Sequence, residues 1–216
     1  MLKAILFDLD GTLANTDPIH LKIWHDLLSP HGYQVDKAFY QTHISGRLNA
    51  EIVRDLLPHM APEEEPQFSA DKEARFRQVA AQQLQPMPGL QPLLEWGAQR
   101  LAMAVVTNAP RGNAEFMLQT LGLQDRFHPV IIADELPRGK PDPLPYQEAL
   151  RQLHLTPEEA LIFEDSTTGI RSAVASGVVT IGVASTHAPE RLCDLGALMA
   201  VPDFTDERLK QMGLGV

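Results

Sequence analysis

Cysteine is almost absent from the sequence, which contains only Cys193 among 216 residues. An internal disulfide is therefore excluded, which suits a reducing compartment, and Cys193 by itself indicates a small packing residue. Long apolar runs are also missing, since none approaches the ~20 residues of a membrane span. The first residues, Met1-Leu2-Lys3-Ala4, lack the charged, apolar and small-residue regions of a signal peptide. We therefore expect a cytoplasmic protein without a membrane partner.

Basic residues are scarce as well. The 18 Lys and Arg against 28 Asp and Glu give a formal net charge of −10. Because the basic residues are dispersed, they form no stripe for nucleic acid and no patch for anionic lipid, and we expect neither partner. An acidic protein that binds an anionic substrate must supply positive charge locally, through a metal ion or a few Lys or Arg side chains. We expect a monomer that acts on a small molecule.

What is present is a hydrophobic content of 44%, enough for a buried core. Short apolar runs alternate with helical patterns, which predicts an α/β fold with a parallel sheet. The expected strands are the run that begins at Ile5 and residues 102–107, 129–133, 160–164 and 178–183. The expected helices of this part include residues 90–99, 114–121, 144–153 and 168–176.

Residues 15–85 interrupt this alternation. They contain no convincing strand, and amphipathic patterns such as Ile19, Ile23 and Leu27 place apolar side chains on one helix face. We therefore predict an all-helical domain over residues 15–85, inserted into a discontinuous α/β core formed by residues 1–14 and 86–216.

Two aspartates follow the first strand, in the segment Ile5-Leu6-Phe7-Asp8-Leu9-Asp10-Gly11-Thr12. Alternate residues of a strand share one side, so Asp8 and Asp10 are predicted to converge at the strand end. Two buried carboxylates persist together only if a cation neutralises them or their protonation states differ, and both conditions describe a catalytic site. The alternative is an ordinary strand followed by an Asp-Gly turn.

Polar residues also end two later strands. Thr107 and Asn108 could donate hydrogen bonds to a phosphoryl oxygen, or could cap the next helix. Asp165 follows the strand 160–164, whose last residue is Glu164. Ligands of a parallel sheet bind at the carboxyl ends of its strands, so these groups are expected beside Asp8. Carboxylates there form a plausible seat for Mg²⁺, which prefers oxygen ligands.

Lys140 lies in the proline-bracketed loop Gly139-Lys140-Pro141-Asp142-Pro143 and is either a local cation for the site or a solvated surface charge. Four motifs follow one another along the chain: Asp8-Leu9-Asp10-Gly11-Thr12, Thr107-Asn108, the loop with Lys140, and Glu164-Asp165-Ser166. In this order they resemble the motifs of the haloacid dehalogenase superfamily of aspartate-nucleophile phosphotransferases. That resemblance implies a Rossmann-like sheet. The helical insert resembles the cap of the subgroup with β-phosphoglucomutases, phosphoglycolate phosphatases and sugar phosphatases, as does the pattern His20-x-x-x-Trp24.

The resemblance implies that Asp8 attacks phosphorus to form an aspartyl phosphate, while Asp10 protonates the leaving group and then activates water. Mg²⁺ would be held by the carboxylates of Asp8 and Asp165 and by the backbone carbonyl of Asp10. Glu164 would be a further ligand or a neighbour of these ligands. The groups that would bind the transferring phosphoryl oxygens are Thr107, Asn108 and Lys140.

Substrate choice is expected in the cap, at the segment Ser45-Gly46-Arg47-Leu48-Asn49. Gly46 would permit close approach, and Arg47 could bind a sugar hydroxyl or a second anionic group, or could be a surface residue. Asn49 belongs to the same segment. His20 is a further substrate-binding candidate, although packing or a hinge role explains such a histidine equally well.

Two alternatives to a phosphatase need comparison. A phosphomutase requires a second phosphate clamp, but Ser45 and Asn49 stand where the β-phosphoglucomutases have Lys and Arg, and Thr107-Asn108 replaces a Ser-Ala pair. A receiver-type signalling module also uses a phosphorylated Asp, yet it is much shorter and lacks a cap. A true dehalogenase is disfavoured by Asp10. We predict a Mg²⁺-dependent phosphatase for a small phosphorylated sugar or organic acid.

Overall fold

The computed structural model describes residues 1–215 and centres on a six-stranded sheet with the strand order β3-β2-β1-β4-β5-β6. Every neighbouring pair of strands is parallel. The strands are β1 (Ala4–Phe7), β2 (Ala102–Thr107), β3 (Val130–Ile132), β4 (Ala160–Glu164), β5 (Val179–Val183) and β6 (Met199–Val201). The predicted α/β class with a Rossmann-like parallel sheet is confirmed.

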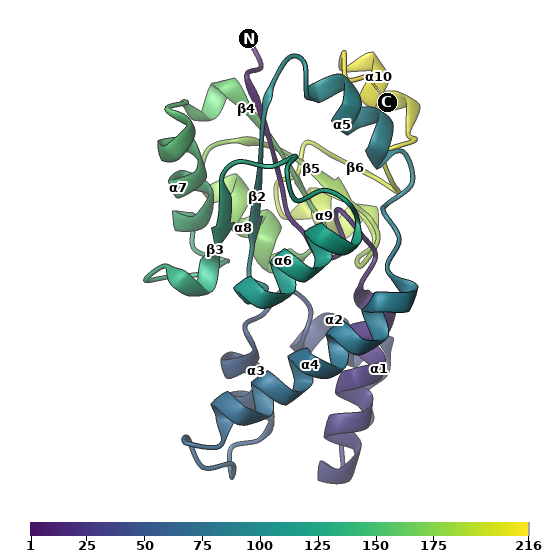
Figure 1. Cartoon of the computed structure of the whole chain (residues 1–216), viewed down its shortest axis with the longest axis vertical. Helices are drawn as coiled ribbons and strands as arrows, with labels where there is room; N and C mark the ends of the chain where they lie inside the picture. Colours follow the sequence, from purple (N-terminus) through teal and green to yellow (C-terminus); the bar gives the residue numbers. More distant parts are fainter. Residues whose placement is uncertain (216) are drawn as a thin grey trace.

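Helices cover both faces of this sheet (Figure 1). They are α5 (Leu90–Gly97), α6 (Arg111–Thr120), α7 (Leu144–Leu153), α8 (Thr167–Ala175), α9 (Pro189–Asp194) and α10 (Glu207–Gln211). Ile5 and Phe7 of β1 pack in the cluster that contains residues of α5, α6 and α10, while Ala4 and Leu6 pack with residues of α7 and α8. Because β1 is buried on both faces, its sequence is a continuous apolar run instead of an alternating one.

The strand order reverses direction between β1 and β4. β2 and β3 extend the sheet on one side of this pair, and β5 and β6 extend it on the other. In a doubly wound sheet, the connections on the two sides leave a crevice at such a switch point, outside the carboxyl ends of the strands. The site predicted from the sequence is therefore expected beyond Phe7 and Glu164.

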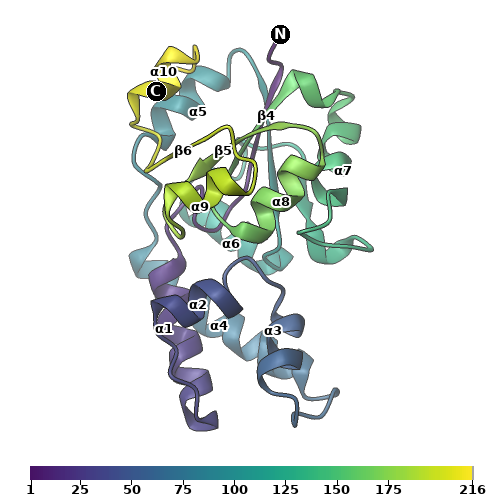
Figure 2. The same cartoon turned by 180° about the vertical axis from the view of Figure 1, so that it is seen from behind.

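Four helices lie beyond the carboxyl ends of the strands, on one side of the molecule (Figures 1 and 2). They are α1 (Asp17–Leu28), α2 (Lys37–His43), α3 (Asn49–Leu56) and α4 (Glu65–Gln83). We call residues 15–85 the helical insert. Its own hydrophobic cluster includes Trp24, Tyr40 and Ile52, whereas Ile23 and Phe76 belong to the main cluster of the sheet. The predicted domain boundaries, 1–14 and 86–216 against 15–85, remain a prediction.

Two further features bear on the sequence analysis. The short strand β6, which pairs with β5 at the edge of the sheet, was not predicted. Among residues 1–215, no helix combines the length and apolar character needed to cross a membrane.

Candidate active site

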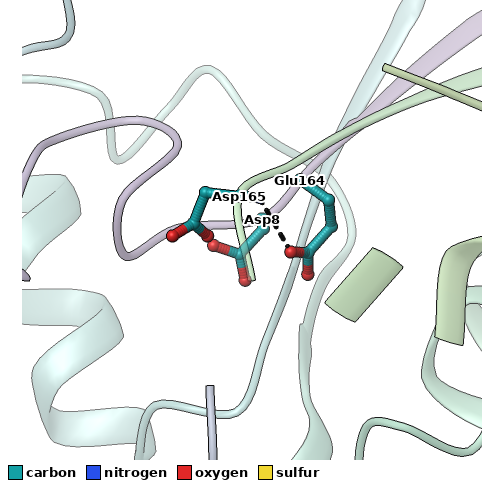
Figure 3. Close-up of side chains that lie close together, drawn as sticks. All are labelled: Asp8, Glu164 and Asp165. Carbon is teal, nitrogen blue, oxygen red and sulfur yellow. Dashed lines mark hydrogen bonds between the residues drawn. The ribbon is translucent and has the colours of Figure 1, made fainter. Parts of the chain in front are cut away.

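The carboxyl ends of β1 and β4 bring three acidic side chains together (Figure 3). Asp8 directly follows β1, Glu164 ends β4 and Asp165 comes next. The N–H of Asp8 donates to the carbonyl of Phe163 at 3.0 Å, which continues the pairing of the two strands. One carboxylate oxygen from each acid lies within 4.8 Å of the others, and all three residues are buried. The two strand ends predicted to carry the site therefore meet.

Lys140 inserts its ammonium group among these acids. Its Nζ donates to Oδ1 of Asp8 at 2.6 Å, to Oε1 of Glu164 at 2.6 Å and to the carbonyl of Val106 at 2.7 Å. These three bonds use all three donors of the ammonium group. Burial alone would lower the pKa of Lys140, but the charges on Asp8 and Glu164 outweigh it and raise that pKa. Lys140 is thus a charged, fully bonded cation inside the core.

Glu164 is fixed behind Lys140 and does not line the cavity described below. Its Oε1 accepts from Lys140 and, at 3.1 Å, from the hydroxyl of Tyr146. Its Oε2 accepts from the two following backbone N–H groups at 2.9 and 3.1 Å. A Cβ on Gly169 would lie 1.8 Å from Oε1 of Glu164, so only glycine fits at this turn of α8. Glu164 orients Lys140 in this arrangement, and its predicted role as a direct metal ligand stays a prediction.

Asp8 and Asp165 remain short of positive charge. Burial, reinforced by Glu164 and opposed by Lys140, raises the pKa of Asp8 to about 8. Burial and repulsion from Asp8 and Glu164 raise the pKa of Asp165 well above its usual range. Within the described chain, Oδ1 of Asp165 is buried without a hydrogen-bond partner, while Oδ2 accepts from Thr186. A hard divalent cation such as Mg²⁺ fits this donor set, because it would neutralise the repulsion and ligate the free oxygen.

Asp10 faces the same cavity in a different environment. Its Oδ1 accepts from Oγ1 of Thr16 at 2.8 Å and lies 3.3 Å from Nε2 of His20. Burial alone would raise the pKa of Asp10, but the hydrogen bonds from His20 and Thr16 and the charge of Lys72 outweigh it and lower that pKa. The pKa values of Asp8 and Asp10 are therefore displaced in opposite directions. Such a separation is how two acids in one site acquire different roles in proton transfer.

Two neighbouring residues of α4, Lys72 and Glu73, were missed by the sequence analysis. Nζ of Lys72 donates to Nδ1 of His20 at 3.1 Å and to Oε1 of Glu73 at 2.8 Å. Because an ammonium group only donates, Nδ1 of His20 must accept, which leaves Nε2 of His20 to donate to Asp10. Both missed residues are nearly fully buried. A charged pair on a long, polar helix gives no sequence signal of burial, since such pairs usually face solvent.

Thr107 and Asn108 lie where β2 ends. Oγ1 of Thr107 accepts from the N–H of Ala109 at 2.9 Å, so this hydroxyl helps to shape the turn. The side-chain amide of Asn108 donates to the carbonyl of Gly46 at 3.1 Å, and its oxygen accepts from the N–H of Lys140 at 3.1 Å. Asn108 thereby ties the loop that carries Lys140 to the helical insert.

Gly46 makes a close contact between the helical insert and α8. Its carbonyl accepts from Oγ1 of Thr168 at 2.7 Å. A Cβ at this position would lie 2.2 Å from the same Oγ1, and the φ of +72° lies in the left-handed region. The close approach predicted for Gly46 is thus made by the chain itself, and an approach to substrate stays a prediction.

Arg47 and Asn49 both have partners within the helical insert. The guanidinium of Arg47 donates to Asp55 at 2.5 Å and lies 3.8 Å from Glu51. Nδ2 of Asn49 donates to Oε1 of Glu73 at 2.5 Å. A substrate contact by Arg47 would therefore compete with its ion pairs.

One cavity of about 340 Å³ lies between the carboxyl edge of the sheet and the helical insert. Cavities of this size accept small metabolites. The predicted site residues that line it are Asp8, Asp10, His20, Gly46, Arg47, Asn49, Thr107, Asn108, Lys140 and Asp165. The fold therefore gathers around one space residues from six segments, which are the end of β1, α1, residues 46–49, the end of β2, the loop with Lys140 and the end of β4.

Comparisons with known proteins agree with this arrangement. A profile described as haloacid dehalogenase-like hydrolase matches residues 5–183. Validoxylamine A 7'-phosphate phosphatase of Streptomyces hygroscopicus subsp. limoneus is 33% identical over 214 residues, which cover 99% of either chain. Fructose-1-phosphate phosphatase YqaB of Escherichia coli (strain K12) is 30% identical over 186 residues, 83% of this chain and 95% of YqaB. A mutant CbbY from Rhodobacter sphaeroides, in complex with xylulose-(1,5)bisphosphate, has a TM-score of 0.84 at 26% identity, covering 95% and 96% of the two chains.

Proposed function

The chain belongs to the haloacid dehalogenase-like hydrolases and is a phosphoric monoester hydrolase, and we propose that it cleaves a small phosphorylated sugar or organic acid through an aspartyl phosphate, with Mg²⁺ as cofactor. The observation that carries this proposal is the position of Asp8 in the cavity wall, bonded to Lys140 and close to Asp165. A carboxylate at the carboxyl end of the central strand, with a cation beside it, suits a nucleophile for an anionic substrate.

In the first step, Asp8 attacks phosphorus, the bond between phosphorus and the ester oxygen breaks, and Asp10 gives a proton to the departing oxygen. The arriving phosphoryl dianion opposes ionisation of Asp10 and so favours the protonated form that this step needs. In the second step, Asp10 accepts a proton from water, whose oxygen attacks phosphorus. The bond between phosphorus and the Asp8 oxygen breaks, which releases inorganic phosphate and restores the Asp8 carboxylate. Thr16 and His20 hold Asp10 in place for both transfers.

Positive charge for the phosphoryl oxygens comes from Lys140, assisted by hydrogen bonds from Thr107 and Asn108. Groups that are held in place before the reaction stabilise developing charge more effectively than mobile ones. Glu164 contributes by holding Lys140, as the 2.6 Å contact supports.

The metal would be held by Asp8, Asp165 and the backbone carbonyl of Asp10. When bound, Mg²⁺ would neutralise charge on the phosphoryl oxygens and lower the repulsion between the carboxylates. The free, buried Oδ1 of Asp165 supports this assignment.

The experiment that tests the proposal measures phosphate release from a panel of phosphorylated sugars and organic acids with Mg²⁺. Wild type, Asp8→Asn and Asp10→Asn are compared, and acid-stable protein-bound phosphate is followed after rapid quenching. Wild type is expected to hydrolyse substrates of the panel. With p-nitrophenyl phosphate, whose leaving group departs without a proton, Asp10→Asn is expected to accumulate phosphorylated protein, because the water step loses its base. Phosphorylation of Asp8→Asn at the wild-type level would refute the proposed nucleophile.

A phosphomutase would return the phosphoryl group to the same sugar. Hexose 1-phosphate is therefore incubated with a trace of hexose 1,6-bisphosphate, and both hexose 6-phosphate and free phosphate are measured. Free phosphate is expected to form faster. The opposite order would replace hydrolysis by mutase chemistry.

A further inference from the structure

Glu73 is a buried carboxylate in the cavity wall that the proposed mechanism does not use. It lies on α4, and the residue is only 6% exposed. A buried charge is retained in a folded protein only when it is paired and hydrogen-bonded. The partners of Glu73 and its remaining acceptor capacity therefore indicate what it can bind.

Three donors converge on this carboxylate. Oε1 accepts from Asn49 at 2.5 Å and from Lys72 at 2.8 Å, and Oε2 accepts from Nδ2 of Asn113. A carboxylate has about four acceptor positions. One acceptor position on Oε2 consequently remains unused, and Glu73 lines the cavity.

The position of Glu73 is fixed from two sides. Asn49 belongs to the helical insert, whereas Asn113 belongs to α6 beside the sheet. Asn113 is itself held by Arg77, whose guanidinium donates to its side-chain oxygen at 2.7 Å. A carboxylate fixed in this way needs little reordering when it binds a ligand, which favours selectivity.

The Lys and Arg side chains of the cavity wall already have carboxylate partners. Arg47 pairs with Asp55 at 2.5 Å, Lys72 with Glu73 at 2.8 Å, and Lys140 with Asp8 at 2.6 Å. Away from Asp8, Asp10 and Asp165, the acidic residues that line the cavity are Asp17, Glu65, Glu73 and Asp134. The described wall thus offers no unpaired Lys or Arg to a second phosphoryl group. Among the described residues, Asp17, Glu65 and Asp134 have no Lys or Arg partner, so their charges repel such a group.

We infer that the substrate is the monophosphate of a polyhydroxylated molecule, that Glu73 accepts a hydrogen bond from one of its hydroxyl groups, and that Glu73 excludes bisphosphates by neutralising Lys72. This inference rests on the proposed phosphatase function and adds the substrate class to it. Glu73 is therefore a specificity-determining residue, which acts on the part of the substrate beyond the reacting phosphoryl group.

The test compares substrates that differ only in a second phosphoryl group. The pairs are fructose 1-phosphate with fructose 1,6-bisphosphate, and glucose 1-phosphate with glucose 1,6-bisphosphate, and kcat/KM is measured with Mg²⁺. Wild type is expected to prefer the monophosphate of the better pair by about tenfold or more. In Glu73→Gln, that preference is expected to shrink by about tenfold, chiefly through KM, because the charge of Lys72 is no longer neutralised and the hydroxyl acceptor weakens.

Asp71→Asn is the matched control, since it removes one negative charge from an exposed position on the same helix. It is expected to keep the wild-type preference. A bisphosphate hydrolysed as well as its monophosphate by wild type, or an unchanged preference in Glu73→Gln, would overturn the inference. Circular dichroism of Glu73→Gln checks that the variant is folded.

p-Nitrophenyl phosphate, which has no hydroxyl groups beyond the phosphoryl group, separates this inference from the proposed function. If wild type hydrolysed neither p-nitrophenyl phosphate nor any sugar phosphate, the proposed phosphatase function itself would be refuted. Hydrolysis of p-nitrophenyl phosphate without that of any sugar phosphate would overturn the polyhydroxylated substrate class alone.

Discussion

Nζ of Lys140 lies 2.6 Å from Oδ1 of Asp8, and both side chains are almost completely buried. These residues are far apart in the sequence, yet their contact resolves a problem set by the composition. An acidic protein needs a local cation to bind an anionic substrate, and Lys140 supplies one directly beside the proposed nucleophile. Glu164 binds the same nitrogen from the other side, so the position of the ammonium group does not depend on Asp8 alone.

Replacing Asp8 by Asn is expected to lower phosphate release by about 10³-fold or more, because an amide cannot form the acyl phosphate. Steady-state phosphate release measures the effect, and circular dichroism monitors the fold. The control is Asp26→Asn, at an exposed position of α1. Turnover of Asp8→Asn close to that of Asp26→Asn would show that another group is the nucleophile.

Mg²⁺ is expected to raise the Tm of the wild-type protein, because it neutralises the repulsion between Asp8 and Asp165. Ligand binding to the folded state contributes about 2.7 kcal/mol at a concentration of 100 times Kd. Thermal unfolding with Mg²⁺ and with EDTA measures the shift. Asp165→Asn should abolish most of it, whereas Asp134→Asn, another change in the cavity wall, should retain it. Equal shifts in the two variants would contradict the assigned ligands.

Glu73 makes stability depend on pH in a defined direction. Burial would raise its pKa, but the charge of Lys72 and the hydrogen bonds from Asn49 and Lys72 outweigh burial and lower that pKa below 4.5. The stabilisation is therefore fully present above pH 4.5 and is lost as the pH falls through the lower value of the folded state. At neutral pH, the free energy of unfolding of the wild-type protein, measured in urea, is expected to exceed that of Glu73→Gln.

That difference should decrease as the pH is lowered below 4.5, because the carboxyl of Glu73 becomes increasingly protonated. Parallel urea titrations of Asp71→Asn provide the comparison for removal of an exposed carboxylate. A gap between wild type and Glu73→Gln that stays constant over this range would exclude an ionised, stabilising Glu73.

Gly46→Ala is expected to destabilise the protein by about 1–3 kcal/mol, since the added Cβ meets Thr168 and the residue has a positive φ. Gly32→Ala is the matched control, because Gly32 has a φ of +86° with nothing within 4 Å of the added Cβ. Urea unfolding of both variants separates backbone strain from the contact with α8. Equal losses would mean that the close contact contributes little.

Several parts of the fold and the site follow from local sequence. β1 is buried on both faces, so its apolar run is visible without knowledge of its neighbours. Asp8 and Asp165 belong to short motifs directly after strand ends, and parallel strands bring such ends to one edge. Lys140 was recognised from its proline-bracketed loop. Strands β1 to β5 were predicted from their apolar runs. The strand β6 (Met199–Val201) was missed because it has one β-branched residue, where the equally short β3 (Val130–Ile132) has three.

Other relationships exist only in the folded chain. Lys72 and Glu73 have the composition of an exposed helix surface, but the packing of α4 between α1 and α6 buries them and provides Asn49 and Asn113 as partners. The ion pair of Arg47 with Asp55 is likewise decided by the path of the helical insert. The sequence alone determined which residues stand at the strand ends, because that follows from local periodicity. Only the tertiary structure decided which charges are neutralised, since burial and pairing depend on segments distant in the chain.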